Sequence, residues 1–182
     1  MLAIDSMRYV ISTALFALAL SLIPQQALAA RTIEPGSVWL TGTTGPRTVF
    51  GSRVGGSGTY LNLGAEAEYT LQSNLGLTGG LTYGLGGSSL WRLHTGFRHK
   101  LYELNSPLAF YGNAEGFVGQ IRGALGANLT QLGVGAGISA DYNLTRALTA
   151  RLAMAVDFGS TLGERPASLN TFSLLVAVSH KL

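Results

Sequence analysis

A long alternating pattern at residues 132–158 constrains the fold of this chain more than any other feature. Leu132–Tyr142 reads LGVGAGISADY, with apolar or small nonpolar residues at every second position, and Leu148–Phe158 repeats this pattern as LTARLAMAVDF. Successive side chains of a strand point to opposite faces, so the alternation predicts two strands. The short segment 143–147 between them predicts a β-hairpin. Each strand is longer than is usual in a soluble sheet.

The length of this hairpin matches a lipid bilayer. At about 3.3 Å per residue, the segment from Leu132 to Tyr142 is about 33 Å long. A tilt of roughly 40° reduces this to about 25 Å, the height of the apolar band of an outer-membrane barrel. Charged residues make up 12% of the chain, about half of the ~25% that is typical of soluble domains. After the N-terminal leader, no segment has the roughly 18 consecutive apolar residues of a membrane helix. A closed barrel is the other structure that satisfies every backbone group in lipid.

The N-terminal segment has the features of a cleavable secretory signal. Arg8 supplies a positive charge, residues 10–23 are an apolar core, and Ala27-Leu28-Ala29 is a small-residue cleavage site. A membrane anchor is the alternative, but the apolar core is too short to span a bilayer. We therefore expect residues 1–29 to be a signal peptide and residues 30–182 to form one outer-membrane β-barrel domain.

The same alternation predicts six further strands. They are Ser37–Thr44, Thr59–Leu71, Leu75–Leu85, Ser89–Leu101, Leu108–Gly119 and Thr171–Leu182. The predicted fold is an all-β, eight-stranded antiparallel transmembrane barrel, with both termini on the periplasmic side. Residues 46–58, 86–88, 120–127 and 159–168 are then the outward loops. A soluble barrel with an apolar interior is the alternative, but it would expose a face with few charges to water.

These eight alternating segments and the final segment FSLLVAVSHKL resemble the small eight-stranded outer-membrane barrels of the OmpA/OmpX-type class. The resemblance covers about Ser37–Leu182 and is one of architecture. Members of this class usually end in Phe or another aromatic residue that the barrel-assembly machinery reads, whereas this chain ends in Leu182. The resemblance implies a monomeric, multi-pass protein of the cell outer membrane, with membrane lipid and the barrel-assembly machinery as partners.

The polar faces of the predicted strands carry charges of both signs. The predicted lumen network comprises Glu66, Glu68, Arg92, His94, Arg98, Glu115, Asp141, Arg151 and Asp157. Opposite charges should pair, because an unpaired charge away from water is costly. Asp141 and Arg151 should face each other across the turn at 143–147. Eight strands leave an interior just wide enough for side chains, which favours a salt-bridged plug over a polar channel. Inward glycines leave some space, so Gly135→Ser should be mild unless this glycine is needed for close packing.

Other function classes have little support in the sequence. Eight-stranded lipid A deacylases carry a His-x-Ser-Asn motif, which does not occur here. The absence of Cys excludes thiolate metal sites, and the net charge of +3 is too small and scattered for nucleic-acid binding. We therefore expect no catalytic residues, metal or cofactor. Trp39 and Trp91 are expected at the membrane rim.

The outward loops are rich in arginine. They carry Arg47, Arg53, Arg122 and Arg165 against the single acid Glu164. These arginines either contact the phosphates of lipopolysaccharide, which Arg binds in a bidentate manner, or are ordinary solvated charges. The expected function is an envelope-structural or surface-interaction role. A narrow passive pore for small solutes is the alternative, and a lipid-modifying enzyme comes third.

Overall fold

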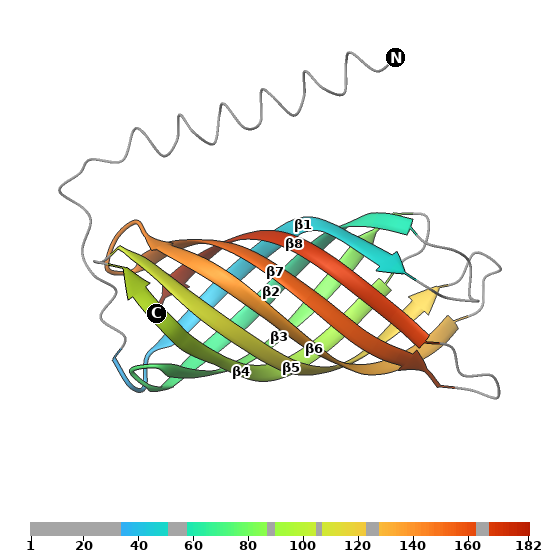
Figure 1. The fold of residues 1–182 in the computed structure, drawn as a ribbon, viewed down its shortest axis with the longest axis horizontal. Coiled ribbons are helices and arrows are strands. Elements are labelled where there is room, and N and C mark those ends of the chain that lie inside the picture. Colours follow the sequence, from blue (N-terminus) through green and yellow to red (C-terminus); the bar gives the residue numbers. More distant parts are fainter. Residues whose placement is uncertain (1–33, 51–57, 87–89, 105–106, 123–127, 163–167) are drawn as a thin grey trace, which may run out of the picture.

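The computed structural model describes residues 34–50, 58–86, 90–104, 107–122, 128–162 and 168–182. Within these ranges, eight antiparallel strands form one closed barrel in sequence order (Figure 1). The strands are β1 (Val38–Phe50), β2 (Gly58–Gln72), β3 (Leu75–Leu85), β4 (Leu90–Leu104), β5 (Leu108–Arg122), β6 (Asn128–Asn143), β7 (Leu148–Thr161) and β8 (Ser168–Lys181). Pairing of β1 with β8 closes the barrel. The predicted signal peptide lies outside the described residues.

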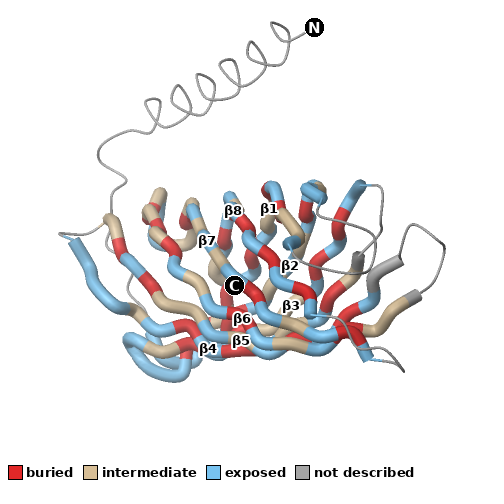
Figure 2. The backbone as a smooth tube through the Cα atoms, turned by 45° about the vertical axis from the view of Figure 1, so that its right-hand side comes forward, coloured by how far each residue is buried: buried red, intermediate tan, exposed pale blue. Residues whose placement is uncertain are grey.

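The strand faces are oriented as the alternation predicts. Apolar residues such as Leu132, Val134 and Ile138 point outward, and Val134 is 62% exposed. Charged residues such as Arg92 and Asp157 are buried inside. Buried and exposed residues alternate along the strands (Figure 2). The predicted transmembrane barrel is therefore confirmed, and the alternative with an apolar interior is wrong. No helix among the described residues is long and apolar enough to cross a membrane.

Aromatic side chains mark both ends of the outward apolar band. Near the barrel end that holds the start of β1 and the C-terminus, they are Tyr69, Tyr102, Phe110 and Tyr142. Near the opposite end, they are Phe50, Tyr83, Trp91, Phe158 and Phe172. Each lies within four residues of a strand end. Aromatic residues are enriched where a bilayer meets water. The start of β1 and the C-terminus lie at the same end of the barrel (Figure 1), which is the periplasmic end in the predicted orientation.

Strand β1 is longer than predicted and contains an irregular site. The alternation ends at Thr44, but β1 continues through Gly45 and Pro46 to Phe50. Neither residue has a partner in the register with β8, and Pro46 has no N–H to donate. Gly45 has a φ of 155°, and a Cβ there would overlap the backbone of Leu174. The Gly-Pro pair therefore interrupts the β1–β8 ladder without ending the strand.

Strand β4 also extends beyond its predicted end. The register with β5 shifts between Lys100 and Tyr102, so the strand has a β-bulge there. As a result, the neighbouring side chains of Leu101 and Tyr102 are both highly exposed. A bulge reverses the faces of the residues that follow it, which is why period-two alternation alone placed the end of this strand too early.

Candidate functional site: a lumen with two tiers of charge

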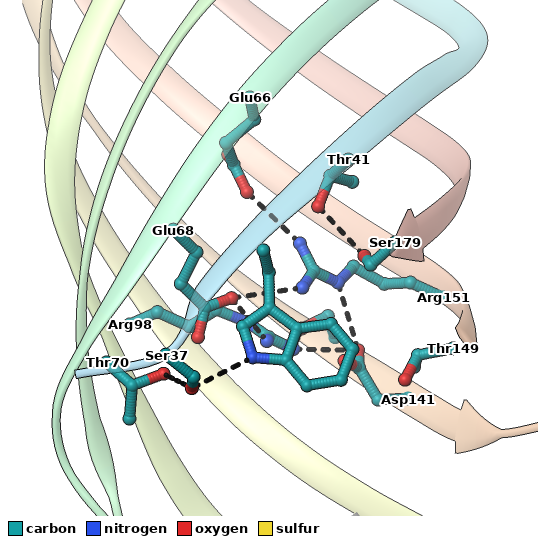
Figure 3. A network of polar contacts seen from close by, with 12 residues as sticks. Ser37, Thr41, Glu66, Glu68, Thr70, Arg98, Asp141, Thr149, Arg151 and Ser179 are labelled. Carbon is teal, nitrogen blue, oxygen red and sulfur yellow. Dashed lines mark hydrogen bonds and ion pairs between the residues drawn. The ribbon is translucent and has the colours of Figure 1, made fainter. Parts of the chain in front are cut away.

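The part of the lumen nearest the start of β1 and the C-terminus holds a cluster of five charged side chains. We call this cluster the periplasmic tier, and its members are Glu66, Glu68, Arg98, Asp141 and Arg151 (Figure 3). Arg98 bonds to Asp141 at 2.7 Å and to Glu68 at 3.0 Å. Arg151 bonds to Asp141 at 3.0 Å, to Glu66 at 3.2 Å and to Glu68 at 3.3 Å. Two guanidinium groups therefore join three carboxylates, and fully buried Asp141 bridges both.

The hairpin prediction about this tier is confirmed. Asp141 and Arg151 are direct partners in the β6–β7 register. Their side chains lie on the lumen face and form the ion pair described above.

Small polar side chains and one indole are buried in the lumen between this tier and the nearer end of the barrel. Trp39 is completely buried, and its Nε1–H donates to the Ser37 hydroxyl, which in turn donates to Thr70. The predicted rim position of Trp39 is therefore wrong. Trp39 shares its phase in β1 with the inward Thr41, whereas Leu40 points outward. Trp91 lies near the outer end of β4, where its indole N–H donates to Gln120.

A second cluster, which we call the outer tier, contains Arg47, Arg92, His94, Glu115 and Asp157. Arg92 donates to Asp157 at 2.6 Å and also contacts Glu115. His94 Nδ1 lies 2.8 Å from Glu115 Oε2. Arg47 Nη2 lies 3.8 Å from Asp157 Oδ2 and therefore adds a second positive charge beside that carboxylate.

The prediction that Arg47 is an outward-loop residue is wrong. Arg47 lies in β1, is only 4% exposed, and donates from Nε to Ser173 at 2.7 Å. The continuation of β1 through Gly45 and Pro46 places Arg47 inside the lumen. The prediction that Arg47 contacts lipopolysaccharide is therefore wrong. Arg53 and Arg165 lie outside the described residues. Arg122 ends β5, and its side chain is also outside the described part. Lipopolysaccharide contact by these three residues stays a prediction.

One arginine in each tier stacks on an aromatic ring. The sequence alone did not predict these two contacts. The Arg92 guanidinium lies 3.8 Å from the centre of the Phe117 ring, and that of Arg98 lies 3.6 Å from the Tyr111 ring. In both cases the ring belongs to the β5 residue two positions before the direct cross-strand partner of the arginine. This diagonal relation is within reach of long side chains and could have been found once the β4–β5 register was known.

Two lysines of the polar faces lie outside the tiers, near the periplasmic end. Lys100 bonds to Glu103 at 2.8 Å, and Lys181 bonds to Glu34 at 2.7 Å. The hydrogen bond from Lys181 and its positive charge lower the pKa of the exposed Glu34 carboxyl. The Lys181–Glu34 pair connects the segment before β1 with the last strand.

Inward glycines make room for the large side chains of the outer tier. The ring of Phe117 lies against Gly133, and the carboxylates of Glu115 and Asp157 lie against Gly135. A Cβ at Gly135 would overlap the Asp157 carboxylate. Gly135 is therefore needed for close packing, which is the condition under which Gly135→Ser was not expected to be mild.

Gly135→Ala should lower the free energy of unfolding by about 1–3 kcal/mol, the usual effect of overpacking. Gly116→Ala on the neighbouring strand is the matched control, since a Cβ there meets nothing within 4 Å. It should be neutral or slightly stabilising, because alanine restricts the unfolded chain more than glycine does. Urea unfolding in detergent micelles measures both. Equal effects of the two substitutions would contradict the close contact at Gly135.

The described residues contain no group of three or more His, Asp or Glu side chains that could hold a metal ion. No protein-family model matches the sequence, and no curated protein matches it either.

Solved structures with the same architecture do match the chain. Neisserial surface protein A matches with a TM-score of 0.69 and 15% identity, over 80% of this chain and 97% of that one. The attachment invasion locus protein Ail of Yersinia pestis gives 0.52 and 8%, over 82% and 100%. The outer membrane protein OprG from Pseudomonas aeruginosa gives 0.52 and 10%, over 85% and 99%.

At these identities the similarity is one of fold, and it agrees with the outward apolar band, the aromatic girdles and the polar lumen. The chain is therefore a small eight-stranded outer-membrane β-barrel of the OmpA/OmpX-type architecture, a multi-pass protein of the outer membrane.

Proposed function

We propose that this protein has an envelope-structural or surface-interaction role and that its lumen is closed to solutes. The observation that carries the proposal is the pair of charged tiers, whose ion pairs cross the barrel interior. Arg92 of β4 reaches Asp157 of β7, and Arg98 of β4 reaches Asp141 of β6. Side chains that meet across the lumen block it and brace strands that are not neighbours in the sheet.

The proposal includes the absence of catalytic activity. His94 is the histidine closest to a catalytic arrangement, because its Nδ1 bonds to Glu115. A triad also needs a nucleophile at the other ring nitrogen. Among the described residues, His94 Nε2 has no hydrogen-bond partner. His99 is exposed and lies near Asn74, and His180 is exposed on β8.

A narrow pore is the second candidate, and a cavity of about 80 Å³ in the middle of the lumen favours it. The cavity is bordered by both tiers, which would have to rearrange for a solute to pass. Buried guanidinium–carboxylate pairs are costly to separate, because each partner would be left as an unpaired charge. The geometry therefore supports a closed lumen better than a narrow pore.

Recording in planar lipid bilayers tests this proposal. The wild-type protein should insert without stable conductance steps. A double variant, Arg92→Ala with Arg98→Ala, removes one cross-lumen side chain from each tier and should conduct small ions. Correct folding of both proteins is checked by their heat-dependent mobility on gels. Regular conductance steps from the wild-type protein would contradict the closed barrel and support the narrow pore.

A further inference from the structure

The lipid-facing wall of the barrel carries a hollow of about 790 Å³. The hollow crosses six strands, from β5 over β6, β7, β8 and β1 to β2, and we call it the wall groove. Its lining includes the outward residues Gly42, Leu63, Tyr142, Ala150, Leu152 and Val178. A Cβ at Gly42 would meet nothing within 4 Å, so the space over this glycine is open.

The wall groove rises from the periplasmic end of the barrel toward the middle of the membrane. Four of its lining residues are successive cross-strand partners, namely Tyr142, Ala150, Val178 and Gly42. In this order they lie one, two, three and four residues from the periplasmic ends of their strands. A path across six strands has five steps of about 4.8 Å, which is about 24 Å along the wall. In the predicted orientation, the groove therefore runs from headgroup depth into the hydrocarbon of the periplasmic leaflet.

The lining of the wall groove suits an acyl chain. Its outward side chains carry no charge, and the polar ones are the hydroxyl groups of Thr44 and Tyr142. Arg151 also borders the groove, but its side chain lies on the lumen side and is paired with Asp141. An acyl chain reaches through half of the ~30 Å hydrocarbon core, so the groove is long enough to hold one.

A cation lies where the wall groove opens at the periplasmic end. Arg146 belongs to the turn between β6 and β7, the strands that supply Tyr142 and Ala150. The Thr145 hydroxyl accepts from the backbone N–H groups of the two residues after Arg146, at 3.2 and 3.0 Å, which fixes this turn. Arg146 is exposed. His180 is also exposed, two residues beyond Val178 on the same face of β8.

The acids at this end of the barrel leave the charge of Arg146 uncompensated. Glu34 pairs with Lys181 at 2.7 Å, and Glu103 pairs with Lys100 at 2.8 Å. The acids of the periplasmic tier lie inside the lumen. Among the described residues, Arg146 forms no ion pair, so the opening of the wall groove is positively charged. Arginine binds phosphate in a bidentate manner, which makes a phosphate group the matching ligand.

We propose that the wall groove binds one phospholipid of the periplasmic leaflet. One acyl chain of this lipid lies in the groove, and its phosphate binds to Arg146. Tyr142 and His180 are further hydrogen-bond donors at headgroup level. The site is on the outer wall of the barrel, so it is independent of whether the lumen is closed.

Native mass spectrometry of the detergent-solubilised protein tests the proposal. The probes are dipalmitoylphosphatidylglycerol and dipalmitoylglycerol, which has the same chains but no phosphate. One phosphatidylglycerol should bind per barrel, about tenfold more tightly than dipalmitoylglycerol, because a charge-assisted contact is lost in the neutral lipid. Equal binding of the two lipids overturns the proposal, and so does binding of many phosphatidylglycerol molecules with equal affinity. A barrel dimer that persists when lipid is added would show that a second copy occupies the groove.

Two substitutions to phenylalanine test the position of the acyl chain. Ala150→Phe fills the wall groove and should remove the binding of phosphatidylglycerol. Ala114→Phe is the matched control, because Ala114 is an exposed alanine of β5 that does not line the groove. It should bind the lipid as the wild-type protein does. Heat-dependent mobility on gels checks that both variants fold, and wild-type affinity in Ala150→Phe overturns the proposal.

Two substitutions to glutamine test the position of the phosphate. Arg146→Gln should weaken the binding of phosphatidylglycerol about tenfold and leave that of dipalmitoylglycerol unchanged. Lys100→Gln removes a positive charge from the same end of the barrel, but Lys100 is paired with Glu103, so lipid binding should not change. Equal effects of the two substitutions on phosphatidylglycerol would show that general surface charge attracts the lipid, which overturns the assigned site.

Discussion

Replacing Asp141 with asparagine should lower the free energy of unfolding by about 3–5 kcal/mol, the usual cost of breaking a buried ion pair. Asp141 is fully buried and accepts from both arginines of the periplasmic tier at 2.7 and 3.0 Å, whereas Glu68 reaches the same two arginines at 3.0 and 3.3 Å. Asparagine keeps the size of the side chain but removes its charge, so both guanidinium groups lose the nearer of the two carboxylates that they share, in a place that water reaches poorly. Equilibrium unfolding in detergent or lipid measures the effect.

Glu66→Gln is the matched control, because it removes the same charge from the same tier. Among the described residues, Glu66 forms its one ion pair with Arg151, at 3.2 Å, and its side chain is 16% exposed. Arg151 keeps Asp141 and Glu68 when Glu66 is neutral, so the cost should be about 1 kcal/mol or less. A double-mutant cycle of Asp141→Asn with Arg151→Met should also show strong coupling. Equal effects of Asp141→Asn and Glu66→Gln would show that net charge, and not the bridging geometry, decides the stability of this tier.

Val134→Arg should cost about 2–4 kcal/mol, as measured for arginine on the lipid face of a barrel near the bilayer midplane. Val134 is in the middle of β6, points outward and is 62% exposed in the structure, so the bilayer surrounds its side chain. An arginine there must leave water, distort the bilayer or reach for the headgroups. Unfolding in lipid vesicles measures the cost.

Thr130→Arg provides a control on the same strand and the same face. Thr130 is the second outward-facing residue from Val134 in the direction of the outer end of β6. It therefore lies near the membrane surface. A charge at that depth reaches water and headgroups and should cost about 0–1 kcal/mol. If arginine is equally tolerated at both positions, the outward face of β6 is not in contact with hydrocarbon.

The sequence alone determined the class of fold and the orientation of its faces. Period-two alternation is a local property, because each residue's face follows from that of its neighbour. Residues such as Val134 and Arg151 could therefore be assigned to lipid and lumen directly. The bounds of Leu75–Leu85 were predicted correctly, since alternation and turn residues end together there. The Asp141–Arg151 pair was also predictable, because a short hairpin turn sets the register of its two strands.

Only the tertiary structure decided which charges meet across the lumen. Closure of the barrel and the stagger of its strands bring Arg98 to Asp141 and Arg151 to Glu66, contacts between strands that are not adjacent in sequence. No local pattern contains this information, because it depends on the tilt and shear of the whole sheet.

The irregular positions were predicted wrongly for a related reason. Gly45 and Pro46 resemble a loop in the sequence, but the pairing of β1 with β2 continues past them and carries Arg47 into the lumen. Trp39 was expected at the membrane rim because it is a tryptophan, but the phase of β1 places its side chain inside the barrel. At such sites the hydrogen bonds of neighbouring strands outweigh the preference of the individual residues, and these strands come together only when the barrel closes.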